Sequence, residues 1–230
     1  MADQVRAGGI AIIDFGSQVT QLIARRVREA SVYSEIFPPA VTAAQLERLA
    51  PRGVILSGGP ASVYERGAPQ LPPFLKLSPY PVLGICYGMQ LLAHELGGRV
   101  LRSAKREYGP AILRRTAASP LLDGLPPRTR VWMSHGDSVN ATPPGCKTVG
   151  ATDNCPHAAM ADVAKRIYGV QFHPEVVHTE RGTEILRNFV FKVCGCKPAW
   201  TMAAYAKGAV ERIRQQTGKE RVLVAISGGV

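Results

Sequence analysis

The sequence predicts an α/β fold, in which a mostly parallel open sheet with helices on both faces is extended by antiparallel strands. In about the first hundred residues, short runs that are apolar at nearly every position alternate with longer segments whose apolar residues repeat at helical spacing. Continuously apolar strands are typical of a parallel sheet that is covered on both faces. From residue 111 to residue 172, strand-like runs are separated by Pro and Gly turns, which indicates antiparallel strands.

The expected elements follow from these two periodicities. Up to residue 98 we expect strands at 10–14, 32–37, 53–57 and 82–85, and helices at 19–27, 42–49 and 87–96. After residue 110 we expect strands at 111–114, 130–133, 148–151 and 167–172, and a helix at 179–194. Thr42 is a suitable N-cap for the second helix, because its hydroxyl can accept a hydrogen bond from a free N–H of the first turn.

A domain boundary is expected at Gly195-Cys196-Lys197-Pro198, which divides the chain into a first domain at 1–195 and a second segment at 196–230. In the second segment we expect a helix at about 202–216, a strand at 221–226 and a closing Ser227-Gly228-Gly229-Val230. A strand that leads directly into Ser-Gly-Gly predicts a linker and the opening of another domain that has been cut away.

The composition is that of a globular protein, with 230 residues of which 46% are hydrophobic and 20% charged. No apolar run approaches the roughly 18 residues that a membrane span requires, and residues 1–6 lack the features of a secretion signal. We therefore expect a cytoplasmic protein without a membrane partner. Five cysteines, an odd number in a chain of this length, argue against a disulfide framework. Cys194-Gly195-Cys196 is too closely spaced for a zinc half-site, so no metal is expected.

The formal net charge of +11 raises the question of nucleic-acid binding. However, the basic residues are scattered along the chain and are not interleaved with aromatic residues, as they are in single-strand binding surfaces. The sequence favours a solvated basic surface, facing an acidic partner or phosphorylated ligands, over a nucleic-acid partner.

Cys86 is the candidate nucleophile. Gly84-Ile85-Cys86-Tyr87-Gly88 follows a buried strand and opens a helix, which is the small-x-nucleophile-x-small pattern of a nucleophile elbow. The bend exposes the nucleophile at the C-terminal edge of the sheet, where open α/β sheets bind ligands. The positive end of the helix dipole favours the thiolate. A structural cysteine in a strand-to-helix turn is the alternative, and the elbow alone does not decide between the two.

His173 and Glu175 supply the partners that such a nucleophile needs. His173-Pro174-Glu175 follows the expected strand 167–172, and residues at i and i+2 of an extended segment point the same way. Glu175 can therefore orient the imidazole while the ring exchanges a proton with Cys86. Of the five histidines, His173 is the one that directly follows an expected strand and has a carboxylate two residues further along. Given the elbow, this pattern favours a catalytic triad over a surface loop.

An oxyanion hole is expected at the same edge of the sheet. Ser57-Gly58-Gly59-Pro60 leaves the third strand there, and glycines allow backbone N–H groups to approach a substrate. The N–H groups of Gly59 and Tyr87 are the candidates that would stabilise a developing oxyanion. An ordinary turn before a proline is the alternative reading of this segment.

Gly-Ile-Cys-Tyr-Gly-Met-Gln at 84–90 and Gln-Phe-His-Pro-Glu at 171–175 resemble the class I, triad-type glutamine amidotransferases, a flavodoxin-like α/β family. Within that family, further segments are similar to the amidotransferase domain of the GMP synthase subfamily. These segments lie at 13–18, 55–64, 106–109, 132–137 and 154–156. The resemblance spans about residues 10 to 195, which is almost the whole of the first domain.

The resemblance implies that glutamine is hydrolysed to glutamate and ammonia through a thioester on Cys86, with no metal or organic cofactor. It also implies which residues bind the α-amino and α-carboxylate groups of glutamine. These are the side chain of Gln90 and, around the backbone of one strand, Ser134, His135, Gly136 and Asp137.

The closing segment is similar to the start of an ATP pyrophosphatase (synthetase) domain, which would use ATP and Mg to activate XMP for amination. The chain stops before the Asp-Ser that continues the family signature, so ATP binding does not carry over to these residues. Two alternatives remain open at this stage: the glutaminase domain of another class I amidotransferase, and a catalytically silent regulatory module of the same fold.

The elbow predicts which thiol reacts. A glutamine-analogue electrophile is expected to label Cys86 alone among the five cysteines, because only Cys86 follows a strand and opens a helix between two glycines. Peptide mass spectrometry of the labelled chain measures this. Label on Cys146, Cys155, Cys194 or Cys196 in place of Cys86 would overturn the assignment.

Overall fold

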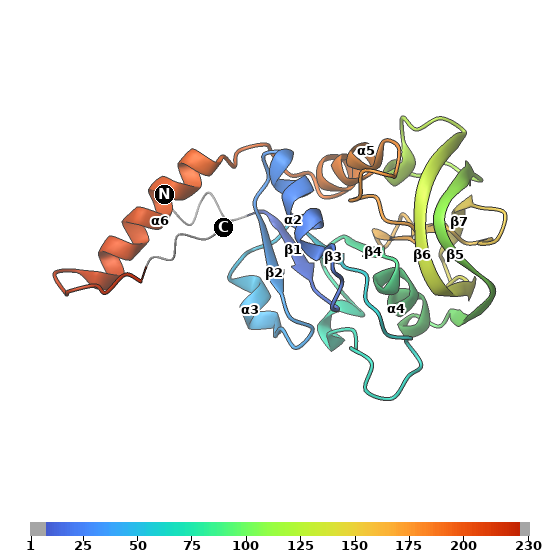
Figure 1. The fold of residues 1–230 in the computed structure, drawn as a ribbon, viewed down its shortest axis with the longest axis horizontal. Coiled ribbons are helices and arrows are strands. Elements are labelled where there is room, and N and C mark those ends of the chain that lie inside the picture. Colours follow the sequence, from blue (N-terminus) through green and yellow to red (C-terminus); the bar gives the residue numbers. More distant parts are fainter. Residues whose placement is uncertain (1–7, 226–230) are drawn as a thin grey trace.

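The computed structural model describes residues 8–225, which form a single nine-stranded mixed sheet with helices on both of its faces (Figure 1). The strands are β1 (Ile10–Ile13), β2 (Ser34–Phe37), β3 (Gly53–Leu56), β4 (Val82–Ile85), β5 (Arg99–Arg115), β6 (Arg128–Ala141), β7 (Lys147–Ala151), β8 (Ala159–Asp162) and β9 (Ile167–Val170). The α-helices are α2 (Thr20–Glu29), α3 (Ala43–Glu47), α4 (Tyr87–Glu95), α5 (Gly182–Arg187) and α6 (Met202–Thr217). Shorter helical segments are η1 (Pro73–Leu75), η2 (Pro120–Leu122) and the π-helical η3 (Asn188–Val193).

The strand order is β2-β1-β3-β4-β9-β8-β7-β5-β6. The five strands from β2 to β9 pair in parallel, and each pairing from β9 to β6 is antiparallel. The predicted fold class, a parallel open sheet extended by antiparallel strands, is therefore confirmed. β9 belongs to both halves, since it pairs in parallel with β4 and antiparallel with β8.

Two apolar cores cover the two faces of the parallel half, and alternate strand residues supply them. One core joins α2, α5 and η3 to Ile10, Ile12, Ile55, Leu83 and Ile85. The other joins α3 and α4 to Ala11, Ile13, Val54, Leu56 and Val82. Each fully buried Ile or Leu contributes about 1.5–3 kcal/mol relative to an exposed one. Burial on both faces explains why these strands are apolar at every position.

Helix α4 is buried along almost its whole length, from Tyr87 to Ala93. It packs against β4 and β3 on one side and against β5 and β6 on the other. Helix α3 begins as expected at Thr42, which forms a capping box with Gln45: the Thr42 hydroxyl accepts from the Gln45 N–H, and the Gln45 side chain accepts from the Thr42 N–H.

The strands β5 and β6 are far longer than the predicted 111–114 and 130–133. They form one antiparallel ribbon, with register shifts at Arg99–Val100 and between Arg102 and Glu107. The early part of β5 is rich in Arg, Lys and Ser, so its apolar pattern is weak, and pairing with β6 stabilises it instead. Strand β8 was missed altogether, because Ala-Met-Ala-Asp is buried at every position and shows no alternation.

The helix expected at 179–194 begins only at Gly182 and continues as the π-helical η3. Residues 179–181 form the turn before α5 instead. The Thr179 hydroxyl donates to the His173 carbonyl oxygen at 2.6 Å, and Arg181 has a left-handed φ of 56°. The expectation of a strand at 221–226 is wrong for residues 221–225, which are irregular and exposed. Residues 221–225 have no strand beside them in the described sheet, and an isolated strand is not stable. Ile226 and the closing Ser227-Gly228-Gly229-Val230 lie outside the described residues.

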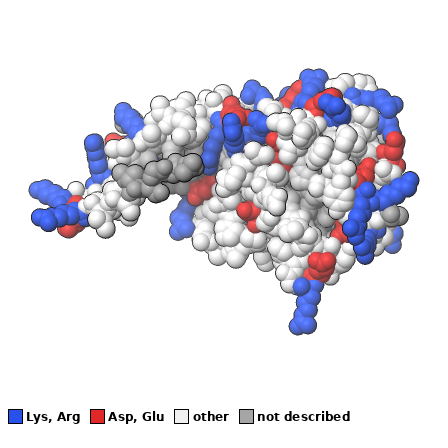
Figure 2. Space-filling view, in the orientation of Figure 1, with Lys and Arg blue, Asp and Glu red and all other residues white. Residues whose placement is uncertain are grey.

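Beyond residue 200, α6 leaves the body of the molecule (Figure 1) and buries only Gly208. Lys and Arg side chains are spread over the face in Figure 2, on α6, along the upper edge and at the end of the β5–β6 ribbon, with Asp and Glu among them. They do not form one continuous stripe on this face. None of the described helices combines the length and the apolar character needed to cross a membrane.

Candidate active site

Cys86 stands in a strained turn between β4 and α4. Its φ of 52° and ψ of −109° lie outside the helical and extended regions, a conformation that costs about 1–3 kcal/mol for a residue with a side chain. Backbone hydrogen bonds hold the turn: the Cys86 N–H donates to Val170 O at 2.8 Å, and the Gly88 N–H donates to Ser57 O at 3.0 Å. The predicted elbow is therefore present.

Both elbow glycines are required by close packing of the backbone. A Cβ on Gly84 would lie 2.5 Å from the carbonyl carbon and oxygen of Gly88, and a Cβ on Gly88 would collide with the carbonyl of Leu56. Because Gly84 and Gly88 carry no side chain, the first turn of α4 can lie directly against β3 and β4. Its first N–H groups therefore point toward the region around Cys86.

His173 and Glu175 lie at the end of β9, which is the strand next to β4. The His173 Nδ1 atom is 2.7 Å from Glu175 Oε1, and both side chains are buried. The other carboxylate oxygen, Glu175 Oε2, has no hydrogen-bond partner among the described residues. His173 is therefore the side chain that stabilises the buried charge of Glu175.

The His173 ring and Cys86 lie on the same side of Gly58, since a Cβ on that glycine would be 3.2 Å from His173 Cε1 and 3.6 Å from Cys86 Cβ. Burial acts to lower the pKa of His173, but its interactions with Cys86 and Glu175 outweigh it and raise the pKa to about 10. The imidazole therefore stays protonated at neutral pH. A protonated ring beside the sulfur is the arrangement that stabilises a cysteine thiolate.

The predicted oxyanion loop lies beside these groups. A Cβ on Gly58 would lie 3.2 Å from His173 Cε1 and 3.6 Å from Cys86 Cβ, so the loop passes close to both. A Cβ on Gly59 would be 2.6 Å from the carbonyl oxygen of Phe15. Within residues 8–225, the N–H groups of Gly59 and Tyr87 donate no hydrogen bond, which leaves both available to a ligand.

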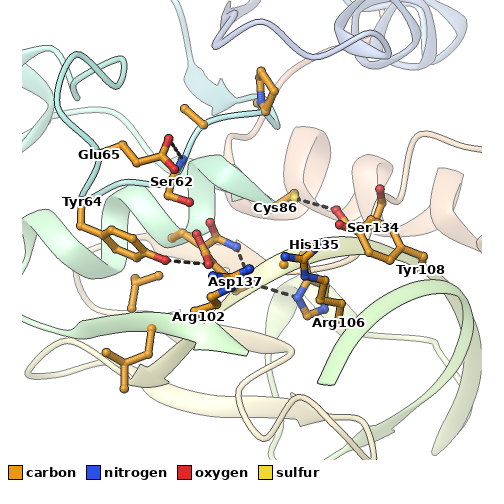
Figure 3. A pocket seen from close by; sticks show the side chains of 17 residues that line it. Ser62, Tyr64, Glu65, Cys86, Arg102, Arg106, Tyr108, Ser134, His135 and Asp137 are labelled. Carbon is orange, nitrogen blue, oxygen red and sulfur yellow. Dashed lines mark hydrogen bonds between the residues drawn. The ribbon is translucent and has the colours of Figure 1, made fainter. Parts of the chain in front are cut away.

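Two further groups surround the sulfur of Cys86. The thiol donates to Ser134 O at 3.6 Å (Figure 3), and the Gln171 Nε2 atom donates to Cys86 Sγ at 3.7 Å. Gln171 had no role in the sequence analysis beyond its place in the 171–175 motif. Its position two residues before His173 is the signal that could have found it, because the same period of two had already paired His173 with Glu175.

A cavity of about 940 Å³ opens above Cys86, lined by the loop after β3, by α4 and by the β5–β6 ribbon. Gln90 is one turn along α4 from Cys86, and its Nε2 donates to Asp137 O at 2.8 Å. At the rim, the Tyr64 hydroxyl donates to Asp137 Oδ1 at 2.8 Å, joining the loop to β6 (Figure 3). Gln90, Ser134, His135, Gly136 and Asp137 all line this cavity, so the structure brings together every residue that the sequence singled out for substrate binding.

The hydrogen bonds of the His135 side chain, however, are made to other residues of the β5–β6 ribbon. Its Nδ1 atom donates to Asp137 O at 2.9 Å, and its Nε2 lies 3.2 Å from Glu107 Oε2. Glu107 also accepts from Thr152 and Asn154. Burial lowers the pKa of His135, and the nearby Glu107 carboxylate opposes this only in part. Sequence reasoning missed Glu107, although Arg106-Glu107-Tyr108-Gly109 was noted as a matching segment.

The remaining cysteines are poorly suited to nucleophilic chemistry. Burial raises the pKa of Cys146 to about 11, of Cys155 to about 12 and of Cys196 to about 11, and it raises that of Cys194 still further. In the part of the chain that the structure describes, no cluster of His, Cys, Asp and Glu has the composition of a metal site.

A cysteine at an elbow, a buried His–Glu pair after the adjacent parallel strand and a Gly-Gly loop are the arrangement typical of triad-type cysteine enzymes on an open α/β sheet. The family model described as glutamine amidotransferase class-I matches residues 11–193. The chain therefore belongs to the class I glutamine amidotransferase family.

Relatives of the chain include two enzymes named GMP synthase (glutamine-hydrolysing). That of Thermomicrobium roseum is 56% identical over 221 residues, covering 96% of this chain and 42% of the relative. That of a Synechocystis species is 49% identical over 230 residues, covering all of this chain and 42% of the relative. The chain thus spans about two fifths of the length of these curated relatives.

Among solved structures, a Thermoplasma acidophilum protein described as a GMP synthase subunit superposes with a TM-score of 0.75 at 28% identity. The match covers 91% of this chain and 98% of the other. A Thermotoga maritima glutamine amidotransferase has a TM-score of 0.59 at 21% identity, covers 90% and 92% of the two chains, and supports the fold.

The His173–Glu175 pair predicts a pH-dependent contribution to stability. Because the pKa of His173 rises from its ordinary 6.5 to about 10, this contribution is complete below pH 6.5 and is lost as the pH rises toward 10. Glu175→Gln should lower the free energy of unfolding by about 3 kcal/mol at pH 6, since it breaks a buried charge pair. The difference in the free energy of unfolding between this variant and the unmutated chain should be smaller at pH 10.

Urea unfolding at the two pH values measures this difference. Glu180→Gln is the control, because Glu180 pairs with Arg130 at the exposed surface and such pairs contribute little. A Glu175→Gln effect of the same size at pH 6 and pH 10 would contradict the protonated state of His173.

Proposed function

We propose that the chain hydrolyses glutamine to glutamate and ammonia, with Cys86 as nucleophile, His173 as acid and base, and Glu175 as the group that orients His173. The observation that supports this most directly is the geometry at the end of β4 and β9. There a cysteine at an elbow lies close to a histidine whose Nδ1 atom is 2.7 Å from a buried carboxylate. Membership of the glutamine amidotransferase family supplies the substrate class.

In the first half of the reaction, the Cys86 thiolate attacks the side-chain amide carbon of glutamine. The carbonyl oxygen becomes an oxyanion, which accepts hydrogen bonds from the N–H groups of Gly59 and Tyr87. The protonated His173 then gives its proton to the amide nitrogen, the C–N bond breaks, and ammonia leaves. A γ-glutamyl thioester on Cys86 remains.

In the second half, the neutral His173 takes a proton from water, and the resulting hydroxide attacks the thioester carbon. The same two N–H groups stabilise the second oxyanion. When the C–S bond breaks, glutamate leaves, the thiolate is restored and His173 is again protonated. These steps need only groups that the chain itself supplies, so we propose that the glutaminase reaction uses no metal or organic cofactor.

For substrate binding, we propose that Gln90 and the segment from Ser134 to Asp137 hold the α-amino and α-carboxylate groups of glutamine. Gln90 Nε2 already donates to Asp137 O, so the two substrate-binding elements are coupled before a ligand enters. The Asp137 carboxylate lies in the lining of the cavity and suits an ammonium group. The backbone N–H groups of the same segment suit a carboxylate.

We further propose that the ammonia serves the amination of XMP to GMP by an ATP pyrophosphatase domain that uses ATP and Mg. The relatives in which this chain matches about two fifths of the length are named GMP synthases. In this proposal residues 1–195 are the amidotransferase domain, and 196–230 are a linker and the start of the synthetase domain. Helix α6 projects from the body with exposed Met202, Val210 and Ile213, as a segment that packs against a further partner would. The reaction is assigned to the cytoplasm.

The triad members should differ in the size of their effect. Cys86→Ala should lower glutamine hydrolysis by at least about 10⁴-fold, whereas Glu175→Gln should be roughly a hundredfold less damaging, because the imidazole keeps part of its orientation without the charge. Release of ammonia from glutamine measures both. Cys146→Ala, a change at a partly buried cysteine away from the triad, is the control that should keep the unmutated rate. An unmutated rate in His173→Ala would place the general base elsewhere.

Residues 1–230 alone are expected to be a slow glutaminase that makes no GMP. The Gly58–Gly59 loop faces the open cavity, and a misplaced oxyanion donor costs about 10²-fold or more in rate. Adding the ATP pyrophosphatase domain of a GMP synthase together with ATP and XMP should raise glutamine turnover at least about tenfold. Full turnover that this addition leaves unchanged would refute coupling between the two activities.

A further inference from the structure

We propose that Gln171 is a further catalytic residue, whose side-chain N–H donates a hydrogen bond to the Cys86 thiolate. This hydrogen bond stabilises the thiolate before the thioester forms and after the thioester is hydrolysed. Gln171 follows β9 directly, and its Nε2 atom lies 3.7 Å from Cys86 Sγ. The proposal rests on the proposed function, since it deepens the role of the same nucleophile.

Hydrogen bonds around Gln171 fix the direction in which its amide faces. Gln90 Nε2 donates one hydrogen to Asp137 O at 2.8 Å, since a carbonyl oxygen can only accept. Its other hydrogen goes to Gln171 Oε1 at 3.2 Å. Because the oxygen of Gln171 faces Gln90, the NH₂ group of Gln171 must face the sulfur.

The surroundings make this donor a strong one. Gln171 is fully buried, and its backbone N–H is held by Ala158 O at 2.9 Å, so both ends of the residue are fixed. A hydrogen bond to a charged group in a dry site contributes more than one in water. Among the described residues, His173 lies beside Cys86. The other titratable and charged groups around the cavity that Cys86 lines come from the loop after β3 and from the β5–β6 ribbon: Tyr64, Glu65, Arg102, Arg106, Tyr108, His135 and Asp137.

Gln171 also balances an unfavourable neighbour. Ser134 O accepts from the Cys86 thiol at 3.6 Å, and a carbonyl oxygen at that place stabilises the thiol rather than the thiolate. Gln171 donates to the same atom and so favours the opposite state. The thiolate is the attacking group when the C–S bond forms and the leaving group when it breaks, so one donor assists both steps.

The test is the pH dependence of Cys86 alkylation by iodoacetamide, without glutamine, measured by mass spectrometry of the Cys86 peptide. Gln171→Met keeps the length of the side chain and removes the donor. The midpoint of the pH–rate profile should rise by about one pH unit, the equivalent of a tenfold effect from one hydrogen bond to a charged group. A more basic thiolate is also more nucleophilic, so the rate should fall about threefold below the midpoint and rise about threefold on the high-pH plateau.

A second variant keeps a buried amide. Gln171→Asn draws the NH₂ group back by one methylene, beyond hydrogen-bond distance of the sulfur, and should move the midpoint in the same direction. Asn188→Leu is the matched control, because Asn188 is another buried amide that donates two hydrogen bonds, to Leu121 O and Asp123 O, far from Cys86. The control should leave the profile unchanged, whereas a merely structural loss would slow alkylation at every pH.

An unchanged midpoint in a folded Gln171→Met or Gln171→Asn chain would overturn the proposal, and folding is checked by circular dichroism. Alkylation reports the state of the thiol and does not require that glutamine be the substrate. A shifted midpoint in a chain that releases no ammonia from glutamine would therefore refute the proposed function while supporting the role of Gln171. An unchanged midpoint in a chain that does release ammonia would refute the role of Gln171 while supporting the proposed function.

Discussion

The left-handed turn at Cys86 is the constraint on which the rest of the site depends. A φ of 52° is unfavourable for a residue with a side chain, and the turn persists because backbone hydrogen bonds hold it from two directions. Cys86 N–H is tied to Val170 at the end of β9, and Gly88 N–H is tied to Ser57 at the end of β3. The segment that bears His173 and the Gly58–Gly59 loop leave the sheet at these same two strand ends. The turn therefore brings Cys86, His173 and the Gly58–Gly59 loop together in one small volume.

Burial gives these groups their electrostatic character. His173, Glu175 and Gln171 are nearly inaccessible to water, so the charges of His173 and Glu175 are stabilised by fixed neighbours rather than by solvent. Two contacts hold the backbone of the segment that bears the ring: the His173 backbone N–H donates to Trp132 O at 3.0 Å, and the Thr179 hydroxyl donates to His173 O. Strand β6 and the turn before α5 thus position the backbone of His173.

The parallel half of the fold and the closeness of Cys86, His173 and Glu175 could be predicted because their signals are local. A strand buried on both faces is apolar throughout, and an elbow or a His-x-Glu pair occupies a few consecutive positions. The β5–β6 ribbon could not be predicted in full, because its stability comes from pairing between strands and not from the residues of either strand. The contacts of Gln171 and Glu107 could not be predicted from the sequence, for a related reason. Gln171 is oriented by Gln90, 81 positions away, and Glu107 meets His135, 28 positions away.

The adjacency of β4 and β9 has a consequence for how the molecule tolerates change. Cys86 and the segment that bears His173 follow two neighbouring strands that are paired in register from Val82–Ile167 to Ile85–Val170, so this pairing sets the distance between their backbones. The cavity walls instead come from the β3 loop and from the ribbon at the far edge of the sheet. Most of the cavity wall therefore belongs to elements other than the strand pair that positions Cys86 and His173. Among the described residues, only the carbonyls of Trp132 and Ser134 tie the ribbon to these two residues by hydrogen bonds, so the rest of the ribbon can change its side chains while the pairing of β4 with β9 stays the same.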